Sequence, residues 1–304
     1  MNEDYNLRRF EEACGLLPQR LRVAALEVDK AHKIGAEELR LRVGRPVHLT
    51  LPNGEIPVPN SRVISSDLAQ VVDRATEFSR YASAESIRRG HVTAKGGFRV
   101  GLCGTAVTEG GRSLDIRDIS SLAIRIPRVC EDAARPLLPE LLESGRLCST
   151  LILSPPGGGK TTLLRDLVRL VSQGTELAEP MRVSLVDERG ELAAVYRGQP
   201  QLDVGICTDV MDGCPKHLAV PMLLRAMNPR VIALDEIALK EDVAAVLLAA
   251  GCGASLLATA HASDRQELAS RPVGQALLDC GVFRRLAVIT GRGERRRFRV
   301  EVLP

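Results

Sequence analysis

A glycine-rich loop between a predicted strand and a predicted helix restricts the fold of this chain more than any other feature. Residues 154–161 (SPPGGGKT) follow the G-x-x-x-x-G-K-[ST] pattern of phosphate-binding loops, with Ser154 in place of the first glycine. The apolar run at 150–153 predicts a buried strand, and the apolar spacing over 162–171 predicts a helix. Because the motif requires this strand–loop–helix context, we expect a nucleoside triphosphate site here.

The side chains of this loop are of the types that bind a triphosphate and its Mg²⁺ ion. Consecutive glycines let backbone N–H groups and the helix N-terminus face the phosphates. Lys160 would neutralise the β- and γ-phosphates, and the Thr161 hydroxyl would bind Mg²⁺. The alternative, a glycine turn with a chance lysine, is disfavoured by the flanking pattern. The predicted nucleotide-binding residues are Pro156, Gly157, Gly158, Gly159, Lys160, Thr161 and Thr162.

A second strand end supplies carboxylates, which hydrolysis needs in addition to a phosphate-binding loop. The apolar run at 231–234 predicts a buried strand, and Asp235 and Glu236 follow it in the Walker B pattern. Acids at the end of a parallel strand lie at the edge where ligands bind. We therefore predict that Asp235 helps Thr161 to bind Mg²⁺ and that Glu236 orients or deprotonates the attacking water. Two exposed acids in a loop are the alternative.

A further apolar run at 181–186 ends in Asp187, Glu188 and Arg189. It lies between the loop helix and the Walker B strand in the sequence, as in P-loop ATPases with an additional strand. Glu188 is therefore a competing candidate for the catalytic base. In the alternative interpretation, Asp187 and Arg189 only cap or pair at the edge of the sheet.

The longest stretch without a charge covers residues 243–260 and raises the question of a membrane helix. Glycines within 251–253 interrupt it, so we expect a buried helix, a turn and a buried strand at 256–260. His261 follows that strand, where it would contact the γ-phosphate and sense hydrolysis. A surface histidine is the alternative.

Composition narrows the class of protein. Hydrophobic residues make up 45% of the 304 residues, which is enough for a sizeable core. A net charge of +3 and only 3% aromatic residues argue against direct nucleic-acid binding. The eight cysteines form no C-x-x-C pair and no signal peptide is evident, so we expect a reducing, cytoplasmic location. A metal site at Cys207, Cys214 and His217 is a weaker alternative.

The pattern of the chain changes near residue 130. We predict a small α+β domain over 1–130, a linker over 131–147 and a P-loop ATPase domain over 148–304. The fold class is therefore α/β: a RecA-like P-loop ATPase core with a parallel sheet, preceded by a smaller α+β N-terminal domain. In the first domain we predict strands at 38–43, 47–51, 91–93, 98–102 and 121–126, a helix that starts at 65–67 and runs to residue 75, and a helix near 84–89.

These motifs resemble those of type II and type IV secretion ATPases. Residues 228–236 and 259–263 look like their Walker B and His boxes, and 187–189 looks like their Asp box. Arg99 and Arg125 lie in segments similar to the arginine segments of those enzymes. The resemblance implies that these arginines act across subunits as arginine fingers, and Arg128 joins them by proximity.

A closer resemblance is to the stage III sporulation protein AA family, which are AAA-type ATPases of spore-forming bacteria. Residues 38–46, 96–102, 155–166 and 203–216 carry it, in order along the chain. The sequence departs from the family pattern at Phe98, at Ala238 and after Lys216, which puts the role of the loop after Lys216 in doubt.

This resemblance implies an ATP- and Mg²⁺-dependent ring ATPase, a hexamer, that works under a secretion-like apparatus between mother cell and forespore. The implied place is the mother-cell cytoplasm, peripheral to the membrane, with membrane proteins as partners and no transmembrane segment. A RecA-like ATPase acting on nucleic acid is the main alternative; a nucleotide-gated scaffold with little turnover is another. The basic tail supports the nucleic-acid alternative, although such a charge run is more typical of a solvated hairpin. Its arginines are Arg292, Arg295, Arg296, Arg297 and Arg299.

Overall fold

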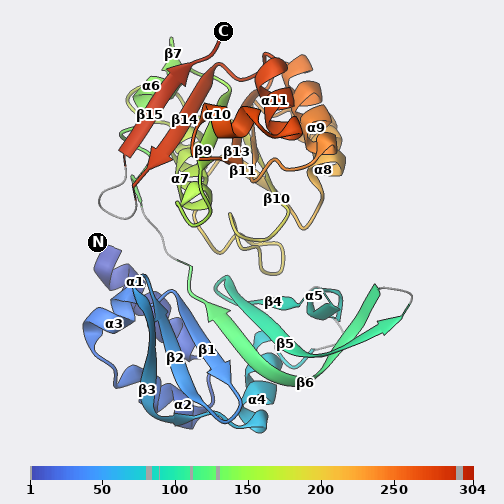
Figure 1. The fold of residues 1–304 in the computed structure, drawn as a ribbon. Helices are drawn as coiled ribbons and strands as arrows, with labels where there is room; N and C mark the ends of the chain where they lie inside the picture. The colour runs from blue at the N-terminus through green and yellow to red at the C-terminus, as the bar shows by residue number, and fades with distance from the viewer. Residues whose placement is uncertain (1, 80–83, 89, 110–111, 128–130, 292–296) are drawn as a thin grey trace. The chain divides into compact units, whose positions relative to one another are not determined.

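The computed structural model describes residues 2–79, 84–88, 90–109, 112–127, 131–291 and 297–304, and it divides into two compact units (Figure 1). The first unit contains residues 1–129 together with 194–201. The second unit contains residues 130–193 and 202–304.

The first unit is built on a six-stranded antiparallel sheet in the order β3-β2-β1-β6-β5-β4. Its strands are β1 (Glu38–Arg42), β2 (Pro46–Leu51), β3 (Gly54–Arg62), β4 (His91–Ala94), β5 (Phe98–Glu109) and β6 (Arg112–Arg125). Its helices are α1 (Asn2–Cys14), α2 (Gln19–Leu26), α3 (Lys30–Gly35), α4 (Ser65–Ala75) and α5 (Ala84–Arg88).

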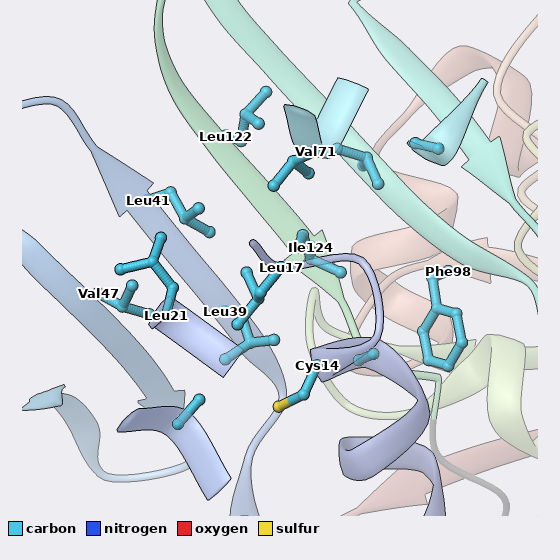
Figure 2. Close-up of a cluster of buried hydrophobic side chains, with 14 of the residues drawn as sticks. Cys14, Leu17, Leu21, Leu39, Leu41, Val47, Val71, Phe98, Leu122 and Ile124 are labelled. Atoms are coloured by element: carbon cyan, nitrogen blue, oxygen red, sulfur yellow. The ribbon is translucent and has the colours of Figure 1, made fainter. Parts of the chain in front are cut away.

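Alternation of apolar and polar residues explains how this sheet buries one face. In β1, Leu39 and Leu41 are fully buried while the arginines between and after them stay partly exposed. Figure 2 shows these two leucines beside Leu122 and Ile124 of β6. The predicted start of α4 also forms, since the Asp67 carboxylate accepts a hydrogen bond from the Ile64 N–H.

The first unit differs from the sequence-based expectation. Its helices α1, α2 and α3 and its strand β3 were not predicted. The strands predicted at 98–102 and 121–126 correspond to the first part of β5 and the last part of β6, two paired strands that are much longer than predicted. Residues 194–201, expected in the ATPase domain, are grouped with the first unit. There Arg197 pairs with Glu77, and Gln201 accepts a hydrogen bond from the Gly96 N–H.

The second unit confirms the predicted α/β class. Its seven-stranded sheet has the order β11-β10-β12-β13-β9-β14-β15, parallel except for the antiparallel edge strand β15. The strands are β9 (Thr150–Ser154), β10 (Val183–Asp187), β11 (Thr208–Asp212), β12 (Val231–Leu234), β13 (Ser255–His261), β14 (Arg285–Thr290) and β15 (Arg297–Val302). The helices are α7 (Lys160–Gln173), α8 (Lys216–Met227), α9 (Lys240–Gly251), α10 (Arg265–Ala269) and α11 (Pro272–Asp279).

The strand order differs from the order of the motifs in the sequence. β13, which follows the Walker B strand along the chain, lies between β9 and β12 in the sheet. β10 lies on the other side of β12. The strand that separates the phosphate-binding loop from the Walker B acids is therefore the strand that ends in His261, and not the strand that ends in the Asp box.

Residues 131–147, expected to be a linker, are part of the second unit. They include α6 (Leu138–Leu141) and the short strands β7 (Leu142–Glu143) and β8 (Arg146–Leu147). Leu137 and Leu141 are fully buried, and the Ala134 N–H donates to the Asp166 carboxylate of α7, so this segment belongs to the fold of the second unit.

The charge-free stretch at 243–260 forms most of α9 and most of β13, joined by a turn, as predicted. Among the residues that the structure describes, no helix combines the length and the apolar character that crossing a membrane requires. Of the basic tail, Arg297 and Arg299 lie on β15, where Arg299 pairs with Glu301. Arg292, Arg295 and Arg296 lie outside the described residues.

Candidate nucleotide-binding and catalytic site

The phosphate-binding loop joins β9 to α7, as the sequence predicted. Gly157 and Gly159 adopt φ angles of 72° and 89°, a region that residues with a Cβ seldom enter. A Cβ placed on Gly158 would lie 1.7 Å from the Ser154 Oγ. The loop therefore tolerates a side chain at none of these positions without strain or collision, and it leads directly into the N-terminus of α7, where backbone N–H groups can face an anion.

Lys160 is the first residue of α7, and it is 6% exposed. Its Nζ lies 3.4 Å from the Ser154 carbonyl oxygen and 2.8 Å from the His261 Nδ1. Burial lowers the pKa of Lys160, against the opposing effect of the Asp235 and Glu236 carboxylates. An anion bound at the loop would compensate this desolvated charge.

Asp235 lies just after β12, and two threonine hydroxyls occupy its two oxygens. The Thr161 Oγ1 donates to Oδ2 at 2.9 Å, and the Thr259 Oγ1 donates to Oδ1 at 2.6 Å. Thr161 and Asp235 were predicted to meet at a Mg²⁺ ion, and they are in direct contact. Thr259 was given no role from the sequence. Its place on β13, two residues before His261 and therefore on the same side of the strand, is the signal that could have revealed it.

Glu236 follows Asp235 with a φ angle of 50°, in the left-handed region. Its N–H donates to the Thr259 Oγ1 at 2.8 Å. Its carboxylate accepts two hydrogen bonds from the Arg189 guanidinium, at 2.6 and 3.3 Å. One carboxylate oxygen, Oε1, lies 3.7 Å from the His261 Nε2.

His261 lies between the cation of the loop and the Walker B carboxylate. Burial lowers the pKa of His261 most, and Lys160 lowers it further, against the opposing effect of Glu236 and Asp235. In the neutral imidazole, Nδ1 accepts from the Lys160 ammonium, so the ring proton is on Nε2 and faces Glu236. The strand end predicted to carry a sensor thus lies between Lys160 and Glu236.

Glu188, the competing candidate for the base, has a different partner. Its Oε2 lies 2.6 Å from the Lys216 Nζ, and the Lys216 side chain is only 8% exposed. Asp187 is 2% exposed, and its carboxylate accepts hydrogen bonds from the N–H groups of residues 191–193. Asp187 and Arg189 therefore cap and pair at the sheet edge, as in the alternative interpretation of this segment.

Asp187 also has an acidic neighbour on the adjacent strand. It is the register partner of Asp212 at the end of β11. The Asp212 side chain is exposed, but partial desolvation beside β10, and then the Asp187 carboxylate, raise its pKa to about 6.

The predicted arginine fingers lie in the first unit. Arg99 and Arg125 are register partners on β5 and β6. The Arg125 Nε donates to the Glu38 Oε1 at 3.2 Å. The second-unit cluster of Lys160, Thr161, Asp235, Glu236 and His261 does not include them, and their action across subunits remains a prediction. Arg128 lies outside the described residues.

The donors at this site suit ATP and Mg²⁺. The glycine cradle and the desolvated Lys160 suit a polyphosphate, while the Thr161 hydroxyl and the Asp235 carboxylate are hard oxygen ligands of the kind that Mg²⁺ binds beside phosphates. Thr162, in the first turn of α7, is half-buried, and Pro156 is exposed in the loop. Over the described ranges, no three His, Cys, Asp or Glu side chains gather as a metal site, and Cys207, Cys214 and His217 form none.

Comparison with known proteins identifies relatives along nearly the whole chain. A family model described as "Sporulation stage III, protein AA" matches residues 7–300. The stage III sporulation protein AA of Bacillus subtilis (strain 168) is 39% identical over 263 residues, which cover 86% of this chain and 85% of that protein.

Solved structures with the same fold are known. The ATPase DotB of Legionella pneumophila superposes with a TM-score of 0.57 at 18% identity, covering 90% of this chain and 78% of that one. The pilus retraction motor PilT with bound ADP superposes with a TM-score of 0.61 at 15% identity, covering 89% and 80%. At such identities these likenesses establish the fold, and the chemistry has to be argued from the site itself.

Proposed function

This chain belongs to the sporulation stage III protein AA family, and we propose that it binds ATP with Mg²⁺ and hydrolyses it. One observation carries the proposal. His261, at the end of β13, lies between residues that follow the two neighbouring strands β9 and β12. Its Nδ1 is 2.8 Å from the Lys160 Nζ at the start of α7, and its Nε2 is 3.7 Å from the Glu236 Oε1. In parallel sheets, ligands bind at the carboxyl ends of the strands.

In the proposed binding mode, residues 156–162 hold the nucleotide. Backbone N–H groups of the glycine loop face the phosphates, and Lys160 places its ammonium against the β- and γ-phosphates. Thr161 and Asp235 hold Mg²⁺, which, when bound, neutralises charge on the phosphate oxygens. The contact between Thr161 and Asp235 supports this pairing.

For hydrolysis we propose that Glu236 orients the attacking water and takes its proton. Support comes from its neighbours. His261, which contacts Lys160, lies 3.7 Å from the Glu236 carboxylate, and the Arg189 that pairs with Glu236 is largely exposed. Glu188, by contrast, pairs with the nearly buried ammonium of Lys216. His261, with its proton on Nε2, would report on the γ-phosphate next to Lys160. Glu188 is then a structural counter-ion and not the base.

ATP turnover by the purified full chain tests the proposal, with Lys160→Ala as the blank. We expect Mg²⁺-dependent release of phosphate by the wild-type protein and none above the blank in the variant. A wild-type rate equal to that of the blank, in a preparation that binds a fluorescent ADP analogue, would support a nucleotide-gated scaffold and refute the hydrolase.

We further propose that the protein works as a homo-oligomeric ring, a hexamer, in which Arg99 and Arg125 act on the nucleotide of a neighbouring subunit. The side-by-side position of these arginines on β5 and β6 and the resemblance of their segments to those of secretion ATPases support this. Turnover per subunit should then rise with protein concentration, and Arg125→Ala should remove the rise. A rate per subunit that is independent of concentration down to the monomeric range would contradict it.

In the cell, we propose that this ATPase energises a secretion-like channel complex between mother cell and forespore. It would act from the mother-cell cytoplasm, peripheral to the membrane, through membrane-protein partners. Family membership supports the link to sporulation. A Lys160→Ala chromosomal allele should block sporulation after engulfment begins while the protein still fractionates with membranes. Normal spore yield from that allele would refute the role.

A further inference from the structure

We propose that Thr259 is a positioning residue, which ties the Mg²⁺-binding carboxylate of Asp235 to the general base Glu236 through one hydroxyl group. The inference rests on the proposed function, because it concerns how the hydrolytic site is held in its working geometry. It assigns Thr259 no contact with nucleotide or water.

The hydroxyl of Thr259 forms hydrogen bonds with both Walker B residues. It accepts the N–H of Glu236 at 2.8 Å and donates its proton to the Asp235 Oδ1 at 2.6 Å. The carbonyl oxygen of the same residue accepts the N–H of Ile237 at 2.8 Å. Thr259 is fully buried, so water replaces none of these bonds.

The backbone of Glu236 needs such support. Its φ angle of 50° lies in the left-handed region, which is unfavourable for a residue with a Cβ and persists only where surrounding contacts fix it. Thr259 holds this turn from both ends, by its side chain at Glu236 and by its carbonyl at Ile237. Loss of the hydroxyl would leave the Glu236 N–H without its partner and let the carboxylate move.

Asp235 is fixed by the same hydroxyl. The Thr161 hydroxyl holds Oδ2, so the plane of the carboxylate is set by one threonine on each oxygen. When Thr161 and Asp235 bind Mg²⁺, Thr259 keeps Oδ1 in place. A displacement of about 1 Å at a catalytic group costs on the order of 10²-fold in rate.

The residue type is not explained by packing alone. Residues 256–258 and 260 of β13 are apolar and buried, and valine fills the same space in a strand as threonine does. Thr150 of the neighbouring strand β9 is equally buried, and its hydroxyl donates only to the Cys148 carbonyl oxygen at 2.8 Å. It is therefore a matched control that lies at the other end of its strand from the site.

The experiment compares Thr259→Val, Thr259→Ser and Thr150→Val in the full chain. We expect Thr259→Val to lower kcat, measured at saturating ATP and Mg²⁺, on the order of 10²-fold, because Glu236 and Asp235 are no longer held in place. The KM for ATP should rise with the loss of the affinity that Mg²⁺ confers. Serine keeps the hydroxyl, so Thr259→Ser should recover kcat to within about fivefold of wild type. Thr150→Val should lower the melting temperature to a similar degree and leave kcat unchanged.

A second readout does not depend on turnover. A fluorescent ADP analogue is titrated with and without Mg²⁺, and Thr259→Val should lose most of the gain in affinity that Mg²⁺ confers while Mg²⁺-free binding stays unchanged. Equal Mg²⁺ gains in wild type and Thr259→Val, wild-type kcat in that variant, or an equal kcat loss in Thr150→Val would each overturn the inference. If the wild-type protein hydrolyses no ATP, the proposed function fails and the titration still decides the role of Thr259.

Discussion

Glu188 and Glu236 follow neighbouring parallel strands, and replacing each by glutamine should separate a structural carboxylate from a catalytic one. Glutamine keeps the shape of the side chain and removes its charge and basicity. The structure predicts opposite outcomes, because the Glu188 carboxylate pairs with the Lys216 ammonium whereas Glu236 lies beside His261 at the phosphate-binding loop.

The magnitudes follow from burial. Lys216 is 8% exposed, so Glu188→Gln removes the counter-charge of a nearly buried ammonium, at a cost of about 1.5 to 3 kcal/mol. For a unit of this size that corresponds to a fall in melting temperature of about 3 to 12 °C. Glu236 pairs with Arg189, which is 60% exposed, so Glu236→Gln should cost less than about 1 kcal/mol in stability. Loss of a general base should lower kcat by about 10²- to 10⁴-fold.

The assay is a paired measurement of melting temperature and of kcat at saturating ATP and Mg²⁺, well below the melting temperature of both variants. We expect Glu188→Gln to be less stable with a kcat within about threefold of wild type, and Glu236→Gln to be stable and inactive. A stable Glu188→Gln variant that has lost turnover, beside an active Glu236→Gln variant, would refute the reasoning and make Glu188 the base.

Three further outcomes can be checked on the same preparations. Gly158→Ala should weaken binding of a fluorescent ADP analogue, because its Cβ would lie 3.1 Å from the Ser154 Cβ and 3.2 Å from the Pro155 carbonyl oxygen even after the Ser154 hydroxyl rotates away. Gly157→Ala, whose Cβ has no atom of the described residues within 4 Å, should show only a backbone cost of about 1 kcal/mol. The pKa of Asp212 is raised to about 6, so the native state binds this proton more tightly than the unfolded chain does. The free energy of unfolding therefore falls as pH rises from about 4 to 6. Asp212→Asn should raise the urea midpoint at about pH 7 and leave it unchanged at about pH 4. Asp187→Asn should cost about 2 to 4 kcal/mol in urea unfolding, since its buried carboxylate accepts three backbone N–H groups, and a cost below 1 kcal/mol would contradict that role.

Local patterns made the strand, glycine loop and helix around residues 150–173 predictable. The glycines, the lysine and the flanking periodicities that define β9, α7 and β12 all lie within short windows of sequence. His261 could be placed because a buried apolar run ended directly before it. What local patterns do not contain is the order of strands in the sheet, and so they did not show that β13 lies between β9 and β12.

Contacts between residues far apart in the sequence could not be predicted either. The pairing of Glu188 with Lys216 joins a strand end to the start of α8, and neither residue signals the other. In the first unit, α1 was overlooked although its signal is present. Phe10, Ala13, Cys14 and Leu17 follow helical spacing, and all are fully buried.

The outer half of the β5–β6 hairpin was missed for a different reason. Its residues beyond Cys103 lack clean alternation, and the register is broken between Cys103 and Thr105. At Gly104 a Cβ would lie 2.5 Å from the Arg117 carbonyl oxygen, so the two strands approach closely there. A glycine in such a run can mean that two backbones approach closely, but this can be recognised only when the pairing of the strands is known.

The position of β13 explains why one strand serves two purposes at this site. His261 is in register with Ser154 of the loop strand, and Ala258 is in register with Leu234 of the Walker B strand. Because side chains alternate along a strand, Thr259 and His261 point to the same side of the sheet. The inner residue, Thr259, holds the backbone that carries Glu236, and the outer one, His261, contacts Lys160 and lies 3.7 Å from the Glu236 carboxylate. A one-residue shift of β13 would move both side chains to the opposite side of the sheet, so the register of this strand joins the phosphate-binding loop and the Walker B acids into one site.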